Sequence, residues 1–105
     1  MNLFTIAETI RAKVPREEML AGLAEEAAEL AQAALKYRRA LDGTNPTPVT
    51  VREAEEALCD EIADVSLYLA VLNMLVDATF ASKLPAQRMV EKITRWAKRL
   101  QEVEA

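Results

Sequence analysis

Apolar residues recur every three or four positions along most of this chain, and that spacing is typical of one face of an α-helix. The first such segment predicts a short amphipathic helix over residues 3–13, from the repeating positions Leu3, Ile6, Ala7, Ile10 and Val14. Proline is tolerated in the first turn of a helix, so Pro15 either ends this helix or begins the next one.

The second helical segment is predicted to run from Pro15 to about Leu41. Its apolar stripe is formed by Leu20, Leu23, Ala27, Leu30, Ala31 and Ala34. Residues 42–48 form the one clear loop, because Gly43 lies just past the expected helix end and two prolines follow it.

Thr50 is a suitable N-cap for a third helix, and Glu53, three residues later, is in the position of a capping box. This helix is predicted to run to about Phe80. A fourth helix is predicted from Ser82 or Leu84 to Glu102. Its apolar face predicts that the single tryptophan packs in a core, beside the other members of the face: Met89, Ile93, Trp96, Leu100 and Val103.

No segment shows the alternating pattern of a β-strand, so the predicted fold class is all-α, with four helices and a central antiparallel helical hairpin. The 105 residues are enough for a single domain over 1–105. Apolar residues surround the third helix, which predicts burial on all sides in an oligomeric helical bundle, at least a homodimer. These residues are Leu67, Leu69, Val71, Leu72, Met74, Leu75 and Val76. Asn73, within this run, is expected either to hydrogen-bond across an interface or to contact substrate.

The composition narrows the function classes. The net charge is −4 and there is no basic run, so nucleic-acid binding through phosphate neutralisation is not expected. The most apolar stretch, Val65 to Val76, is too short to span a membrane, and the N-terminus does not resemble a signal peptide, so a cytoplasmic protein is expected. Cys59 is the single cysteine, which excludes an intrachain disulfide, and we expect it to be buried near the hairpin core.

Two pairs of carboxylates carry the candidate chemistry. At about 100° per residue, Glu26 and Glu29 lie about 60° apart on the second helix, on a small and mostly apolar face. Glu61 and Asp64 have the same spacing on an apolar face of the third helix. One such pair on a helix is usually solvated, but two pairs on the packed faces of adjacent helices indicate a shared site.

Four carboxylates packed together would repel one another unless their pKa values rise or a cation neutralises them. The nearby arginines lie toward the loop end of the hairpin, so a divalent cation is the better expectation. The chain contains no histidine, and ligation by oxygen alone favours Mg²⁺, with Mn²⁺ as the alternative.

The strings Leu23-Ala24-Glu25-Glu26-Ala27-Ala28-Glu29-Leu30 and Asp60-Glu61-Ile62-Ala63-Asp64-Val65 resemble the paired E-E-x-x-E and E-x-x-D signature of MazG-like all-α nucleoside triphosphate pyrophosphohydrolases. The resemblance covers roughly residues 17–100. It implies a helical enzyme that forms a homodimer or homotetramer. It also implies hydrolysis of an NTP or dNTP to the monophosphate and pyrophosphate. The implied metal ligands are Glu26, Glu29, Glu61 and Asp64.

The resemblance also implies substrate contacts, which fall on Lys36, Tyr37, Tyr68, Lys92 and Arg95. Glu25 is expected to act as a general base, to bind a second metal ion or to be a solvated glutamate. Tyr68 either borders the nucleoside or is a core aromatic. Ala28 replaces a glycine that is usual in the family, and the expected tryptophan after the first motif is missing. The alternatives are a non-catalytic helical module that binds a partner, and a phosphoribosyl-ATP pyrophosphohydrolase.

Overall fold

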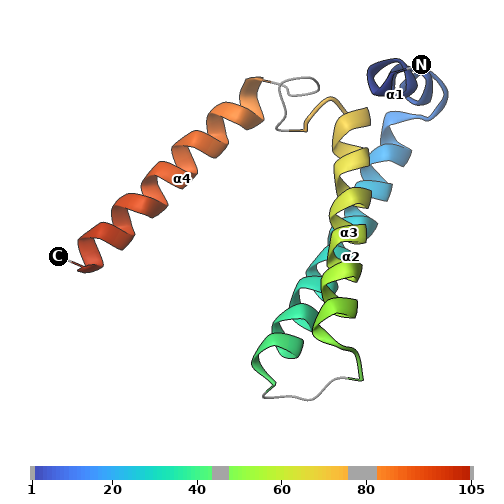
Figure 1. Ribbon diagram of the computed structural model, residues 1–105. Coiled ribbons are helices and arrows are strands. Elements are labelled where there is room, and N and C mark those ends of the chain that lie inside the picture. Colours follow the sequence, from blue (N-terminus) through green and yellow to red (C-terminus); the bar gives the residue numbers. More distant parts are fainter. Residues whose placement is uncertain (1, 44–47, 76–82, 105) are drawn as a thin grey trace.

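The computed structural model describes residues 2–43, 48–75 and 83–104, and all its regular elements are helices (Figure 1). They are α1 (Leu3–Lys13), α2 (Arg16–Asp42), α3 (Val51–Val71) and α4 (Lys83–Glu104). The described ranges contain no strand. The predicted all-α fold of four helices with a central hairpin is therefore confirmed.

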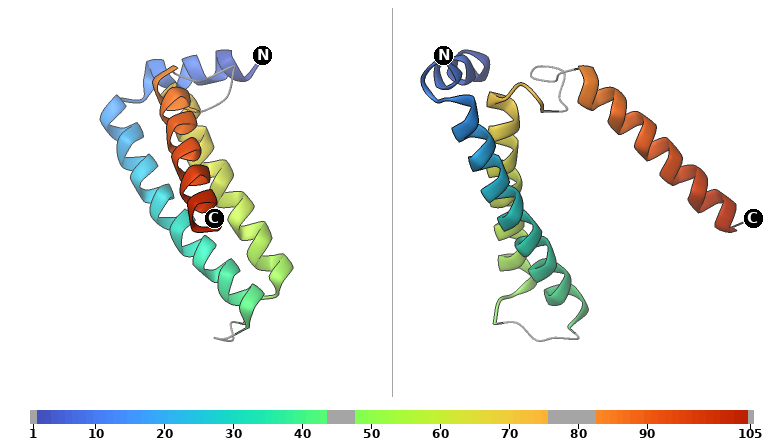
Figure 2. Two further views of the ribbon diagram at one scale, coloured as in Figure 1. Left: turned by 90° about the vertical axis from the view of Figure 1, so that its left-hand side faces the viewer. Right: turned by 180° about the vertical axis from the view of Figure 1, so that it is seen from behind.

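Helices α2 and α3 form the central hairpin and run side by side in opposite directions (Figures 1 and 2). Toward the loop end, Ala33 and Ala54 are buried between them, and such small side chains let two helices approach closely. At the other end the core consists of Met19, Val71 and Leu72, with Ala7 contributed by α1. The packing of the hairpin is therefore divided between its two ends.

Helix α1 lies across the open end of the hairpin and packs on α3. The Arg11 side chain donates a 2.7 Å hydrogen bond from Nε to the carbonyl oxygen of Val71. The last carbonyls of a helix lack partners within the helix, and this arginine satisfies one of them. Its positive charge also interacts favourably with the negative end of the helix dipole. Sequence analysis did not identify this contact, which joins residues far apart in the chain.

The first three helix ends described below are each capped by residues within one turn of the end. Asn2 caps α1 by accepting a 2.8 Å hydrogen bond from the backbone N–H of Thr5. Gly43 ends α2 in the left-handed conformation, with φ of 67°, as its position past the helix end predicts. Thr50 and Glu53 form the predicted capping box, with both hydrogen bonds 3.1 Å long. Residues 44–47 of the predicted loop lie outside the described residues.

The predicted extension of the third helix to about Phe80 is wrong, because α3 ends at Val71. Asn73 has φ of 61°, a left-handed conformation that asparagine tolerates better than most residues. The N–H groups of Asn73 and Met74 donate to the carbonyls of Ala70 and Leu69 at 3.0 and 2.7 Å, which is a Schellman motif. Asn73 is thus a helix stop, and residues 76–80 of the predicted helix lie outside the described ranges.

The predicted apolar stripe of the second helix is only partly right. Leu23 and Leu30 are half-buried, but Leu20 is 45% exposed, and the three alanines of the stripe are exposed as well. The face that packs on α3 is the carboxylate face, with Met19 and Ala33 buried. Because α2 is apolar on two faces, the sequence alone does not show which of them meets α3.

Helix α4 stands apart from the hairpin in Figure 1 and in the right-hand view of Figure 2. Its apolar residues are exposed, and Trp96, expected to pack in a core, is 62% exposed in this chain. Cys59, expected to be buried, is exposed on α3 because its position on the helix faces away from α2. No helix within the described ranges is long and apolar enough to cross a membrane.

Candidate metal centre and its groove

Three of the four predicted carboxylates come together between α2 and α3. One oxygen from each of Glu26, Glu29 and Glu61 lies within 4.8 Å of the other two. Glu26 and Glu61 are half-buried, whereas Glu29 is exposed at the edge of the hairpin. The structure therefore joins two glutamates from one helix with a third from a segment more than thirty residues later in the chain.

The helices position these side chains through their packed faces. Glu26 lies on the same face of α2 as Met19 and Ala33, both of which are buried against α3. Glu61 lies two turns after the buried Ala54 on α3. Because buried apolar side chains fix the helices on both sides of the carboxylates, the backbone positions of Glu26 and Glu61 are held in the interface.

The inner carboxylate oxygens lack partners. Glu26 Oε2 and Glu61 Oε2 are closed off from solvent, and with both groups ionised no hydrogen-bond donor among the described residues reaches either atom. Burial raises the pKa of Glu26 from its ordinary 4.5 to about 7, and the charges of Glu29 and Asp64 act in the same direction. An unpaired buried carboxylate is unfavourable, so a positive charge bound at this site would stabilise it.

Glu61 responds to the same environment. Burial is the largest effect and raises its pKa, and the charges of Glu29 and Asp64 raise it further. A hydrogen bond in which protonated Glu26 donates to Glu61 lowers the pKa of Glu61, but it does not reverse the shift. The two residues therefore compete for a proton when no cation is present.

Asp64 is half-buried on α3, one turn after Glu61, and does not belong to the group of oxygens within 4.8 Å. Its charge nevertheless acts on both Glu26 and Glu61. Its role as a fourth ligand stays a prediction, and the structure places its charge beside the three converging carboxylates.

A groove of about 370 Å³ opens on one side of the hairpin beside these carboxylates. Its lining residues come from both helices and from the segment before α3: Glu29, Gln32, Ala33, Lys36, Val49, Glu53, Ala54, Ala57 and Glu61. Lys36, a predicted substrate contact, is thus in the same groove as two of the carboxylates. Gln32 was missed by sequence reasoning, although its position one turn after Glu29 places it on the same edge of α2.

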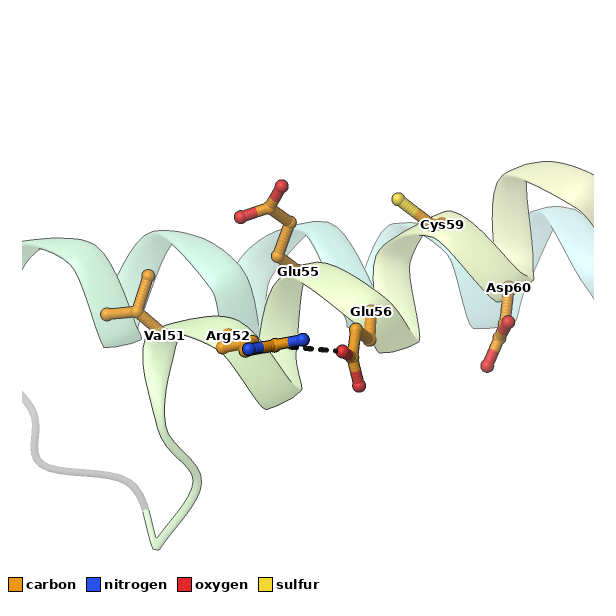
Figure 3. A pocket seen from close by; sticks show the side chains of 6 residues that line it. All are labelled: Val51, Arg52, Glu55, Glu56, Cys59 and Asp60. Carbon is orange, nitrogen blue, oxygen red and sulfur yellow. Dashed lines mark hydrogen bonds and ion pairs between the residues drawn. The ribbon is translucent and has the colours of Figure 1, made fainter.

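A larger hollow, of about 750 Å³, lies along the outer face of α3 (Figure 3). All six of its lining residues belong to this one helix, and Arg52 and Glu56 form a 3.2 Å ion pair across it. Cys59 is exposed and points outward here, in a hollow that Glu55 and Asp60 also line. The carboxylate groove, with residues from two helices, is therefore the better candidate for a site.

The family comparison agrees with this geometry. The model of the MazG nucleotide pyrophosphohydrolase domain matches residues 15–100, which include both carboxylate-bearing helices. This chain belongs to the MazG nucleotide pyrophosphohydrolase family. Comparison with curated proteins found no match, and comparison with solved structures found none either.

The MazG carboxylates fit a divalent cation. The three converging groups offer only oxygen, the donor that hard divalent ions prefer, and two of these oxygens are shielded from water and lack any partner in the described chain. A bound cation would satisfy both orphaned atoms and offset the repulsion that raises the pKa of Glu26. The fit therefore depends on the geometry of this chain as well as on its family.

The predicted aromatic contacts lie elsewhere on the MazG hairpin. The half-buried Tyr68 ring faces Gly22 so closely that a Cβ on residue 22 would overlap it, and the ring also packs against the core at the α1 end. Tyr37 is half-buried on α2 and does not line the carboxylate groove. Gly22 lies one turn before Glu26 on the same face of α2.

The remaining predicted site residues are not brought to the groove. Glu25 is exposed on α2 and lies outside both the carboxylate group and the groove lining. Lys92 and Arg95 are exposed on α4, which stands apart from the hairpin (Figure 2). Their predicted contacts with substrate stay predictions.

Proposed function

We propose that this MazG-family chain hydrolyses a nucleoside triphosphate, NTP or dNTP, to the monophosphate and pyrophosphate, with Mg²⁺ as its cofactor and Mn²⁺ as a substitute. The observation that carries the proposal is the convergence of Glu26, Glu29 and Glu61 around shielded oxygens that have no partner in the described chain. A structural cluster would be expected to contain a lysine or arginine paired with those oxygens.

The carboxylates have a defined task in this proposal. Glu26, Glu29 and Glu61 hold the cation. Asp64, on the next turn of α3, adds a further negative charge beside them. When bound, Mg²⁺ supplies charge neutralisation for the triphosphate and lowers the pKa of a water molecule. The hairpin core fixes the three carboxylates before substrate arrives, which limits the reorganisation that the reaction requires.

Basic and acidic side chains around the groove perform the other roles. Lys36 lines the same groove as Glu29, and its ammonium group is proposed to bind a phosphate oxygen. Glu25 is proposed to accept the proton of the attacking water as a general base. Tyr37 and Tyr68 are proposed to contact the nucleoside. Lys92 and Arg95 are proposed to contact phosphates, which requires α4 to lie near the carboxylate groove.

The decisive experiment is a panel of NTPs and dNTPs, together with phosphoribosyl-ATP, assayed for release of pyrophosphate with Mg²⁺, Mn²⁺ or EDTA. We expect turnover of at least one nucleoside triphosphate with either metal and none with EDTA. Turnover of phosphoribosyl-ATP alone would replace the proposed substrate class. Mg²⁺ binding in calorimetry without turnover of any compound would instead indicate a non-catalytic module.

A further inference from the structure

The contact between Gly22 and Tyr68 closes the interface of α2 and α3 one helical turn from the carboxylates. Gly22 lies four residues before Glu26 on α2, and Tyr68 lies four residues after Asp64 on α3. Because the helices are antiparallel, both intervals run toward the α1 end of the hairpin (Figure 1), and each is about one turn of 5.4 Å. The separation of the helices at this contact therefore also affects the separation of the carboxylates.

The two helices also approach closely on the other side of the carboxylates. Ala33, one turn after Glu29, is 8% exposed, and Ala54, two turns before Glu61, is 4% exposed. Both side chains are a single methyl group, so they keep the backbones near each other. The carboxylates thus lie between two places where small residues set the distance between the helices.

An aromatic ring between two helices would ordinarily hold them apart, and here the ring fits because residue 22 has no side chain. The edge of the Tyr68 ring and its hydroxyl oxygen occupy the position that a Cβ on residue 22 would take. Restoring an ordinary van der Waals separation of at least 3.4 Å would require a movement of about 1 Å. The ring also packs against the core that contains Met19, Val71 and Leu72, so moving the ring alone would disrupt those contacts.

A movement of this size is large for the coordination of a small cation. Ligand oxygens about 2.1 Å from Mg²⁺ lie at most about 4.2 Å apart, whereas oxygens about 2.6 Å from Ca²⁺ lie up to about 5.2 Å apart. The converging oxygens of Glu26, Glu29 and Glu61 lie within 4.8 Å of one another. Helices spread by a further 1 Å or so would therefore hinder coordination of Mg²⁺ more than coordination of Ca²⁺.

We propose that Gly22 is a positioning residue for the cation: by admitting the Tyr68 ring against its backbone, it sets a spacing of α2 and α3 that favours Mg²⁺ over a larger ion. This inference rests on the metal site of the proposed function. Neither residue is a ligand, and both act through the positions of the carboxylates. The role depends on the ring of Tyr68 and not on its hydroxyl, so it is compatible with a contact between Tyr68 and the nucleoside.

The test is calorimetry of Mg²⁺ and of Ca²⁺ binding to the chain without nucleotide, at a pH above the Glu26 pKa of about 7. We expect Gly22→Ala to weaken Mg²⁺ binding at least about tenfold and Ca²⁺ binding less than about threefold, because only Mg²⁺ requires short, near-ideal ligand distances. Loss of stability alone would weaken both ions equally, since both bind the folded chain. An unchanged ratio of the two affinities, with helical circular dichroism intact, would overturn the proposal.

Further variants separate helix spacing from stability. Tyr68→Phe keeps the ring, and Val71→Ala removes core volume without adding bulk between the helices, so both should keep the wild-type ratio of affinities. Ala33→Val adds bulk on the other side of the carboxylates and should lower the preference for Mg²⁺ as Gly22→Ala does, which provides a second test if Gly22→Ala does not fold. In a Tyr68→Leu background, Gly22→Ala should change Mg²⁺ affinity less than about threefold. A full tenfold loss in that background would exclude the ring as the cause.

The same measurements distinguish this inference from the proposed function. A wild-type chain that binds neither ion would refute both the metal site and the role of Gly22. Mg²⁺ binding by the wild type, with the same ratio of affinities in Gly22→Ala, would refute the role of Gly22 alone. A shifted ratio in a chain that hydrolyses no nucleotide would support the role of Gly22 and refute the proposed reaction.

Discussion

The interface between α2 and α3 contains two unlike regions within one hairpin. At the α1 end, Met19 and Leu72 are buried in an apolar core, and the half-buried Tyr68 ring closes over Gly22. A few turns away, the same two helix faces enclose Glu26 and Glu61, whose inner oxygens have no partner in the described chain. The apolar region stabilises the hairpin, and the acidic region destabilises it unless a cation is bound.

This difference shows how a small protein can keep like charges close together. Ala33 and Ala54 are buried beyond the carboxylates, so packed apolar side chains lie on both sides of the acidic region. The carboxylates cannot separate without disturbing that packing. The site is therefore arranged by contacts that take no part in the chemistry, and the two regions should respond differently to substitution.

The largest expected effect is the loss of turnover when a carboxylate of the acidic region is replaced. Glu61→Gln should reduce Mg²⁺-dependent turnover at least about a hundredfold, because it removes one of the charges that hold the cation. In EDTA the variant should unfold at the same or a higher temperature, since it also removes repulsion from Glu29 and Asp64. Asp60→Asn is the control, because the neighbouring Asp60 is exposed and should tolerate the change. Near-normal turnover by Glu61→Gln would show that the acidic region is not the metal site.

The next effect concerns the apolar region. Gly22→Ala should lower the free energy of unfolding by about 1–3 kcal/mol, because the added Cβ would overlap the Tyr68 ring. Without that overlap, alanine in a helix would instead stabilise the protein by about 1 kcal/mol, so the sign of the change is informative. Urea unfolding measures it. In a Tyr68→Leu background the same substitution should become neutral or stabilising, and a loss that persists there would exclude the ring as its cause.

A smaller effect tests whether the two regions are functionally distinct. Tyr68 lies at the edge of the core, one turn after Asp64, and Tyr68→Phe removes its hydroxyl but keeps the packing of the ring. If the hydroxyl contacts the nucleoside, KM should rise several-fold, the equivalent of about 1 kcal/mol. A lower melting temperature with unchanged kinetics would assign Tyr68 to the core alone and place the nucleoside nearer Lys36.

The smallest expected effect is a dependence of stability on pH in the metal-free protein. The pKa of Glu26 is about 7 in the folded chain and near 4.5 when the environment does not perturb it. A raised folded-state pKa contributes stability below the unfolded value, and this contribution is lost as pH rises through the folded value. The melting temperature in EDTA should therefore fall between about pH 4.5 and pH 7. Glu26→Gln or saturating Mg²⁺ should flatten that fall, and an unchanged slope in both cases would assign it to other groups.

The sequence predicted the local features of this fold because they depend on neighbouring residues. The capping box at Thr50 and Glu53 and the left-handed Gly43 each involve side chains or backbone within one helical turn. The pairing of Glu26 and Glu29 also follows from the helical repeat alone. The end of α3 was missed although its signal was local, because Asn73 lies within an apolar run that favours continuation of the helix.

The tertiary structure decided which faces meet. Leu20 and Ala27 form a stripe as apolar as the face that packs, yet they are exposed, because contact with α3 is made through Met19, Glu26 and Ala33. The same choice brings Glu61 to Glu26 and Glu29, and it leaves Asp64 outside the closest group. A helical repeat fixes the angles between residues on one helix, but only packing between helices selects the face that is buried, and with it the carboxylates that share a site.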